Sequence, residues 1–270
     1  MQTLANLNSS TQSESDSTIG SELKLNSARR TALSSTSEQE LRVPYYCEEN
    51  VWRLAYRLLY GNGKGYSPAD RENTSYWVVF ISNERKCCPM LHQRASEDPE
   101  TKPCLWDYHV ILLETTKVIT RGKTVEETKV LDVDSVLPFP VSIEEYVNST
   151  FIKFTSDEVN RKFAPLFRVV RADTYLMHFY SDRSHMKKED GSWIATPPSY
   201  DFIMTADAKL NSKGQKSNLD GYIRMTAKKR ESDRSNIFGE LLSIDQMQER
   251  FRFVKRTERV PGCFSVQSCI

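Results

Sequence analysis

The chain of 270 residues is 39% hydrophobic and 27% charged, with a formal net charge of +1, which is typical of a globular protein with one substantial core. Its near-zero charge argues against a dedicated nucleic-acid-binding protein, which usually carries a basic excess. No apolar run approaches the roughly 20 residues that cross a bilayer, and the polar N-terminus lacks the apolar segment of a secretory signal, so we expect no membrane partner either.

The cysteines show no C-x-x-C pair and no regular spacing, so the sequence indicates neither a zinc site nor a disulfide framework. This usage is typical of a reducing compartment, and we expect the protein in the cytoplasm or the nucleus. The six residues are Cys47, Cys87, Cys88, Cys104, Cys263 and Cys269.

The first 42 residues are dominated by Ser, Thr, Asn, Gln and Glu, and the first aromatic residue of the chain is Tyr45. Such a segment buries too little apolar surface to offset the entropy lost on ordering. We therefore predict a disordered extension over 1–42, a folded domain over 43–255 and a C-terminal tail over 256–270.

The first predicted helix begins at Cys47 and ends before Gly61, with apolar residues at helical spacing from Val51 onward. A thiol in the first helical turn faces unpaired backbone N–H groups and the positive end of the helix dipole, and both favour the thiolate. Glu48 and Glu49 stand in the same turn and oppose it. An isolated cysteine is more often a buried structural residue, so a nucleophilic role for Cys47 needs support from a second pattern.

That pattern lies in the predicted strands. One strand is expected over 76–82 and two more over 106–113 and 129–134, where Val, Ile and Leu predominate. The last two flank the segment Thr120-Arg121-Gly122-Lys123, which carries the glycine that a hairpin turn favours. We therefore expect these two strands to pair as an antiparallel hairpin.

The hairpin brings a histidine and an aspartate close together, and the turn centre decides which aspartate lies opposite His109. A turn centred between Thr120 and Arg121 selects Asp132. Moving the centre by one residue selects Asp134, and because both aspartates share a face, register alone leaves the choice open. A cysteine at a helix start with such a pair beside it is the arrangement of a Cys-His-Asp triad.

The rest of the chain is predicted to be mostly helical over 143–179, loop-like over 181–200 and helical again over 244–253. The stretch 208–236 is polar and locally basic, and we interpret it as a solvated insertion within the domain. Together with the strands, these segments predict a single α/β domain.

His185, in the polar loop, is the alternative to His109 as the catalytic base. A loop orients a side chain less firmly than a strand does, so the pattern favours His109. His92 and His178 have no carboxylate-bearing strand beside them, and we expect them to be surface or packing residues.

Six blocks follow one another along the chain: YCEENVW at 46–52, VFISNERK at 79–86, WDYHV at 106–110, DVDSVLPFP at 132–140, RVVRAD at 168–173 and SDRSHM at 181–186. These blocks, in this order, resemble those of the protein N-terminal glutamine amidohydrolase family. The resemblance covers most of residues 45–205 and is weaker out to about residue 253.

The resemblance implies an activity, a fold and a site. The activity is hydrolysis of the side-chain amide of an N-terminal glutamine to glutamate, with release of ammonia and without a metal or organic cofactor. The fold is a papain- and transglutaminase-like α/β core, in which an antiparallel sheet is flanked by helices. The family's triad falls on Cys47, His109 and Asp132, which selects Asp132 over Asp134 and demotes His185.

The resemblance also implies partners. Its substrates are proteins and peptides with N-terminal glutamine, and their products enter arginylation and the Arg/N-degron branch of protein turnover. We expect a monomer. Selecting a free α-ammonium requires acceptors, for which Glu49, Glu84 and Asp107 are candidates that the sequence does not rank.

Two alternatives stay open. The triad alone does not say which carbonyl is attacked, so a cysteine protease or a transglutaminase-like enzyme of the same fold is the nearer one. The other is a catalytically silent module that binds N-termini.

Overall fold

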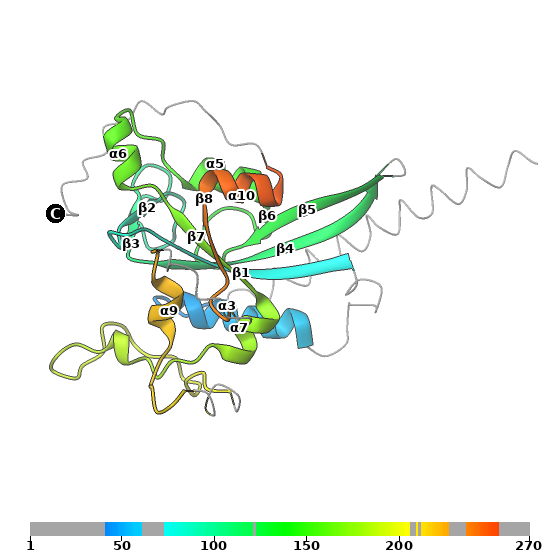
Figure 1. The fold of residues 1–270 in the computed structure, drawn as a ribbon. Coiled ribbons are helices and arrows are strands. Elements are labelled where there is room, and N and C mark those ends of the chain that lie inside the picture. Colours follow the sequence, from blue (N-terminus) through cyan, green and yellow to red (C-terminus); the bar gives the residue numbers. More distant parts are fainter. Residues whose placement is uncertain are drawn as a thin grey trace, which may run out of the picture. The chain divides into compact units, whose positions relative to one another are not determined.

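A six-stranded antiparallel sheet forms the centre of this computed structural model, which describes residues 41–60, 73–120, 123–205, 209, 212–226 and 236–253 (Figure 1). The strand order is β6-β5-β4-β1-β7-β8, so strands far apart in the sequence lie side by side. The strands are β1 (Thr74–Ser82), β4 (His109–Thr120), β5 (Lys123–Leu131), β6 (Val141–Ser142), β7 (Leu166–Arg171) and β8 (Glu240–Ser243). A separate small sheet pairs β2 (Cys88–Met90) with β3 (Cys104–Trp106).

Helices cover both faces of the sheet, because the side chains of its central strands alternate between two cores. Val78 and Phe80 of β1 pack on the face that carries α3, α7 and α9, whereas Val79 and Ile81 pack on the face of α5 and α10 (Figure 1). The helical segments are α3 (Cys47–Tyr60), α5 (Ile143–Thr150), α6 (Asp157–Lys162), α7 (Ala172–His178), the short 3₁₀ helix η1 (Ser184–Met186), α9 (Leu219–Ile223) and α10 (Ile244–Phe251).

The predicted class of fold is confirmed, since an antiparallel sheet flanked by helices makes up this α/β domain. The first helix, the strand over 76–82 and the last helix lie where the apolar spacing placed them. The hairpin is also present, with Thr120 paired to Lys123 at its end. The likeness of the core to papain and transglutaminases stays a prediction.

Four strands, β2, β6, β7 and β8, were not predicted, and β7 contradicts a predicted helix. The stretch 143–179, which the sequence analysis takes as mostly helical, contains β7, which pairs with β1 on one side and β8 on the other. Phe167 and the β-branched Val169 and Val170 fill the two cores from this strand. Pro165 stands just before β7, and this signal argues against a continuous helix.

The predicted polar insertion over 208–236 also differs from expectation where the structure describes it. Residues 219–223 form α9, and the side chains of Leu219 and Tyr222 are buried in the core. Tyr222 stacks on Phe80, with ring centroids 5.1 Å apart. This part of the segment therefore belongs to the domain, and polar neighbours masked its few apolar residues in the sequence.

The described part of the domain starts slightly earlier than predicted, because Leu41 packs in the core and Arg42 contacts Asp134. The predicted extension up to residue 40 and the tail over 256–270 lie outside the described residues.

Cys87 takes part in a disulfide bond, which the spacing of the cysteines did not predict. Within the described ranges, no helix has the length and apolar character needed to cross a membrane.

Candidate active site

The start of α3 is held in place by the chain that precedes it. Asn50 receives the backbone N–H of Val43 on its Oδ1 (2.9 Å) and donates from its Nδ2 to the Val43 carbonyl (2.8 Å). Tyr45 takes a left-handed backbone conformation with φ of 69°, which turns the chain into the helix. These contacts fix the position of Cys47, the first residue of α3.

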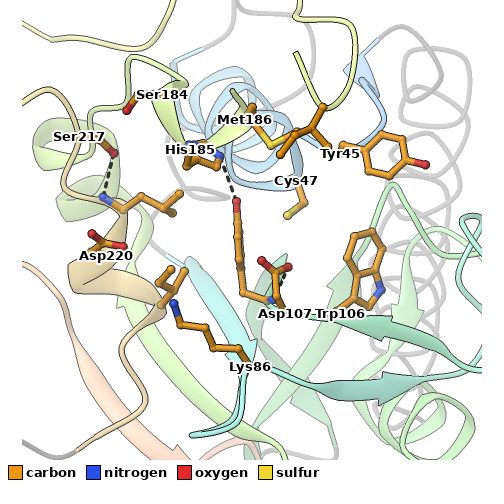
Figure 2. A pocket seen from close by; sticks show the side chains of 14 residues that line it. Tyr45, Cys47, Lys86, Trp106, Asp107, Ser184, His185, Met186, Ser217 and Asp220 are labelled. Atoms are coloured by element: carbon orange, nitrogen blue, oxygen red, sulfur yellow. Dashed lines mark hydrogen bonds between the residues drawn. The ribbon is translucent and has the colours of Figure 1, made fainter. Parts of the chain in front are cut away.

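Cys47 borders a cavity of about 560 Å³ (Figure 2). One part of its lining is formed by Trp106 at the end of β3 and by Asp107 and Tyr108, which link β3 to β4. His185 and Met186 of η1 form another part. Figure 2 shows the sulfur of Cys47 pointing into this space, toward the segment that carries Asp107. The predicted nucleophile is therefore buried in the core and at the same time borders this cavity.

The surroundings of Cys47 oppose a negative charge. Burial raises the pKa of its thiol well above the usual range, and the charges of Glu48, Asp134 and Asp107 raise it further. A hydrogen bond from the backbone of Val110 acts in the opposite direction and is outweighed. The thiol donates to Glu48 Oε2 over 3.7 Å, as a neutral S–H group does. The thiolate expected at this helix start is therefore disfavoured by burial and by the neighbouring carboxylates.

His109 stands at the start of β4, completely buried, and contacts Asp132 directly. Its Nε2 lies 3.0 Å from Asp132 Oδ2, and the hydroxyl of Tyr146 donates to the same carboxylate oxygen over 2.7 Å. Burial lowers the pKa of His109, but the charge and hydrogen bond of Asp132 outweigh it, with a smaller contribution from Asp134, so the pKa is raised above 6.5. This side of the site favours the imidazolium.

The choice between the two aspartates depends on where the hairpin ladder ends. The observed register pairs Thr120 with Lys123 and Leu112 with Leu131, which formally sets Asp134 opposite His109. However, β5 ends at Leu131, and the following turn carries the Asp132 side chain to the imidazole.

Asp134 is held elsewhere. Its Oδ1 forms an ion pair with Arg42 Nε at 2.7 Å, and its backbone N–H donates to Asp132 Oδ1 over 3.0 Å. Asp134 therefore supports the orientation of Asp132, and the structure gives the contact with His109 to Asp132.

The imidazole of His109 is oriented by stacking as well as by its acid partner. The ring of Trp106 lies over it, with centroids 5.0 Å apart and planes 21° from parallel. Nδ1 of His109 is buried and has no hydrogen-bond partner among the described residues. Cys47 reaches β4 at Val110, the residue next to His109. With Nε2 engaged by Asp132, Nδ1 is the nitrogen left for proton exchange.

A second group of polar side chains surrounds the carboxylate of Glu48, the residue that follows Cys47. The hydroxyl of Tyr108 donates to Glu48 Oε2 over 3.1 Å, and His185 Nε2 lies 3.4 Å from Glu48 Oε1. Burial lowers the pKa of His185, but its hydrogen bond and charge interaction with Glu48 prevail and raise it. His185, demoted by the sequence analysis, thus lines the same cavity as Cys47 and partners Glu48.

The other glutamate of the first helical turn is neutralised. Both oxygens of Glu49 accept from Arg183, at 2.7 and 2.8 Å, and the carboxylate is fully buried. Arg183 also donates to the carbonyl of Tyr200, so it ties the start of α3 to the loop around residues 198–201. Glu84, by contrast, is exposed in a turn and does not line the cavity.

Several residues that shape the site were missed from the sequence: Tyr146, Trp106, Arg42 and Arg183. The blocks around 106–110 and 181–186 contain two of them, but nothing in their spacing indicates which side chain each would contact.

Among the described residues, no group of three or more His, Cys, Asp or Glu side chains is arranged to hold a metal ion. The arrangement can perform thiol–imidazole chemistry on a ligand in the cavity.

Comparison with known proteins places these residues in a family context. The family model described as N-terminal glutamine amidase matches residues 42–251, which include every residue of the site described above. The match extends from the segment before α3 to the last residue of α10.

Individual relatives agree with this match. The chain is 42% identical to the protein N-terminal glutamine amidohydrolase of Homo sapiens over 183 residues, which is 68% of this chain and 77% of the relative. It is 42% identical to the protein of that name from Bos taurus over 166 residues, covering 62% and 72% of the two chains. The relative from Arabidopsis thaliana is 41% identical over 183 residues, covering 68% and 74%.

Proposed function

Because the chain belongs to the N-terminal glutamine amidase family, we propose that it hydrolyses the side-chain amide of an N-terminal glutamine, giving glutamate and ammonia. It is a hydrolase that acts on proteins and peptides. The observation on which the mechanism rests is the state of His109, whose Nε2 is engaged by Asp132 while its buried Nδ1 has no hydrogen-bond partner among the described residues.

The first half of the reaction forms a thioester. The Cys47 thiol passes its proton to His109 Nδ1, and the sulfur attacks the side-chain amide carbon of the glutamine. The imidazolium then gives this proton to the amide nitrogen, the C–N bond breaks, and ammonia leaves. Asp132 and Tyr146 stabilise the imidazolium, because the carboxylate compensates its charge and the hydroxyl holds the carboxylate in place.

The second half regenerates the thiol. His109, now neutral, takes a proton from water, and the hydroxide attacks the γ-glutamyl thioester carbonyl. The C–S bond breaks and the proton returns to sulfur, which leaves a glutamate side chain. The backbone N–H of Cys47, at the start of α3, is a suitable donor to the oxyanion in both halves.

Three further statements belong to the same proposal. The glutamate product would expose a new N-terminus to arginylation and to the Arg/N-degron branch of protein turnover. This role requires a cytoplasmic or nuclear enzyme. A monomer suffices, since the described residues of one chain supply all the groups used above.

The test is mass spectrometry of a Gln-initiated peptide incubated with the protein, with ammonia measured in parallel. We expect a gain of about one dalton and one ammonia per peptide, with an intact backbone. Peptide cleavage would indicate a protease, ammonia release coupled to amine incorporation a transglutaminase, and binding without turnover a silent module.

Selectivity provides a second readout. A site that binds both the amide and a free α-ammonium leaves polar groups unpaired when either is missing, which can cost about 10³-fold or more in rate. The N-acetylated peptide and a peptide with glutamine second should therefore be inert. N-terminal asparagine is one methylene shorter, so its amide carbon falls about 1.5 Å short of the sulfur, a misplacement that costs about 10²-fold.

A further inference from the structure

The carboxylates around Cys47 differ in how their charge is compensated. Four of those in the described residues face a basic side chain within ion-pair distance, and all four are buried. These pairs are Glu48 with His185, Glu49 with Arg183, Asp132 with His109 and Asp134 with Arg42. Their charges are used inside the protein, so none of them is available to a cationic ligand without breaking an existing pair.

Asp107 is different. It lies in the bend between β3 and β4, it is exposed, and its carboxylate lines the cavity beside Cys47 (Figure 2). Its Oδ1 accepts the backbone N–H of Tyr108 over 2.8 Å, which fixes the orientation of the side chain. In the part of the chain that the structure describes, no basic side chain forms an ion pair with it. Asp107 therefore offers an oriented, uncompensated negative charge to the cavity.

Asp107 and Cys47 line the same cavity, which an N-terminal glutamine would have to bridge. In an extended glutamine, bonds of about 1.5 Å place the α-nitrogen about 5 Å from the side-chain amide carbon that the sulfur attacks. Asp107 is near enough to Cys47 for its charge to act on the thiol. A ligand whose amide carbon touches the sulfur can thus bring its ammonium to this carboxylate.

The backbone around Asp107 is also fixed. The hydroxyl of Ser82, at the end of β1, donates to the carbonyl of Asp107. His185, the nearby cationic group, contacts the hydroxyl end of Tyr108, whereas Asp107 precedes the backbone end of that residue (Figure 2). His185 and Asp107 are therefore separated along one tyrosine side chain, and Lys86 and Asp220 also line the cavity.

On this geometry, and resting on the proposed function, we propose that Asp107 is the specificity residue that binds the α-ammonium of the substrate's N-terminal glutamine. Glu49 and Glu84, the other candidates from the sequence, are excluded because one is enclosed with Arg183 and the other lies outside the cavity lining. The carboxylate does not take part in bond making. It positions the first residue so that the side-chain amide reaches Cys47.

The experiment compares two substrates in matched variants. One substrate is a Gln-initiated peptide, and the other is the same peptide with a 4-carbamoylbutanoyl group in place of glutamine, which keeps the amide and lacks the α-ammonium. Asp107→Asn keeps the acceptor for the Tyr108 N–H and removes the charge. Asp107→Ser is a second neutral variant, since a serine hydroxyl also accepts such a bond. Asp220→Asn is the control, an exposed carboxylate that lines the same cavity on α9.

We expect both Asp107 variants to lose about 10- to 100-fold in kcat/KM on the Gln peptide, mainly through KM, because a hydrogen-bonded charge pair of this kind is lost. Their rates on the desamino peptide should stay within about threefold of wild type, so the preference for the ammonium falls by about the same 10- to 100-fold. Asp220→Asn should keep the preference.

Three results would overturn the proposal: an unchanged preference in both Asp107 variants, an equal loss on both substrates, or a collapse caused by Asp220→Asn. Failure of the proposed function itself is a separate result, since wild-type protein would then release no ammonia from the Gln peptide.

Discussion

Around His109, the partners Asp132, Tyr146 and Trp106 hold the imidazole and favour its positive charge. Around Cys47, burial and neighbouring carboxylates raise the pKa of the thiol. We call the surroundings of His109 the imidazole half of the site and those of Cys47 the thiol half. The imidazole half favours the transfer of a proton from Cys47 to His109, whereas the thiol half opposes it. One half readily accepts a proton, and the other resists releasing it.

This difference indicates what the substrate contributes. The raised pKa keeps the sulfur protonated, which protects it from oxidation and alkylation, since the thiolate is the reactive form. A cationic group bound at Asp107 would compensate part of the negative charge near the thiol. Substrate binding would then favour the proton transfer that the free site disfavours.

The largest effect is expected from removing the thiol half altogether. Cys47→Ala should lower kcat by about 10⁴-fold or more while the protein keeps its fold, because no other group forms the thioester. Single-turnover and steady-state ammonia release, with circular dichroism for the fold, measure this. Cys104→Ala is the matched control and should keep near-normal rates. Persistent turnover in Cys47→Ala would refute the mechanism.

In the imidazole half, Asp132→Asn should cost about 10² to 10⁴-fold in kcat, since the amide does not compensate the imidazolium. The pKa of His109, followed by NMR, should fall, because burial then acts without the opposing charge.

The same variant tests the pH dependence of stability. The raised pKa of His109 means that its protonation stabilises the folded state below about pH 6.5, and this contribution is lost as the pH rises through the folded-state pKa. Asp132→Asn should remove that dependence from thermal unfolding curves recorded as a function of pH. An unchanged curve would show that the pair is not ionised in this range.

A smaller effect is expected from removing the Tyr146 hydroxyl, which donates to Asp132. Tyr146→Phe removes the donor to Asp132 and should cost about 1 to 2 kcal/mol in the free energy of unfolding and about 10-fold in kcat. Tyr222→Phe is a matched control, because the Tyr222 hydroxyl is equally buried but has no hydrogen-bond partner among the described residues. Chemical denaturation of both variants measures the difference, and equal losses would deny Tyr146 a special role.

Changing the charge of the thiol half should give a gain rather than a loss. Glu48→Gln removes the largest charge that raises the pKa of Cys47, so the thiolate fraction at neutral pH should rise. We expect alkylation of Cys47 by iodoacetamide to become several-fold faster, since the thiolate is the reacting species. The pH dependence of that rate measures the shift. A slower reaction would show that the loss of the contact between Glu48 and His185 dominates.

The smallest effect is expected at the N-terminus. Deleting residues 1–40 should change neither the melting temperature nor kcat/KM on short peptides beyond a small factor, because this segment lacks core-forming aromatic residues. Deleting two more residues removes buried Leu41 and leaves Asp134 without Arg42, which should cost about 1 to 3 kcal/mol. Thermal unfolding of the two truncated proteins separates these effects.

Local patterns determined a large part of this molecule. The helical spacing after Cys47, the alternation in β1 and the hairpin between β4 and β5 are properties of neighbouring residues, and each was readable in the sequence. Position at a helix start also singled out Cys47, and the strand that begins with His109 singled out the candidate base. The predictions of these elements succeeded because hydrophobic periodicity and turn chemistry act over a few residues, whereas the roles of Cys47 and His109 stay predictions.

Only the tertiary structure decided the partners of these groups. The pairing of β7 with β1 turned a helix-like stretch into a strand, because burial on both faces outweighs local propensity. The end of β5 at Leu131 gave His109 to Asp132, although the hairpin register pointed to Asp134. The contacts of Tyr146, Arg42 and Arg183 join segments that are separate in the sequence. Such contacts depend on how the elements pack, which no local pattern encodes.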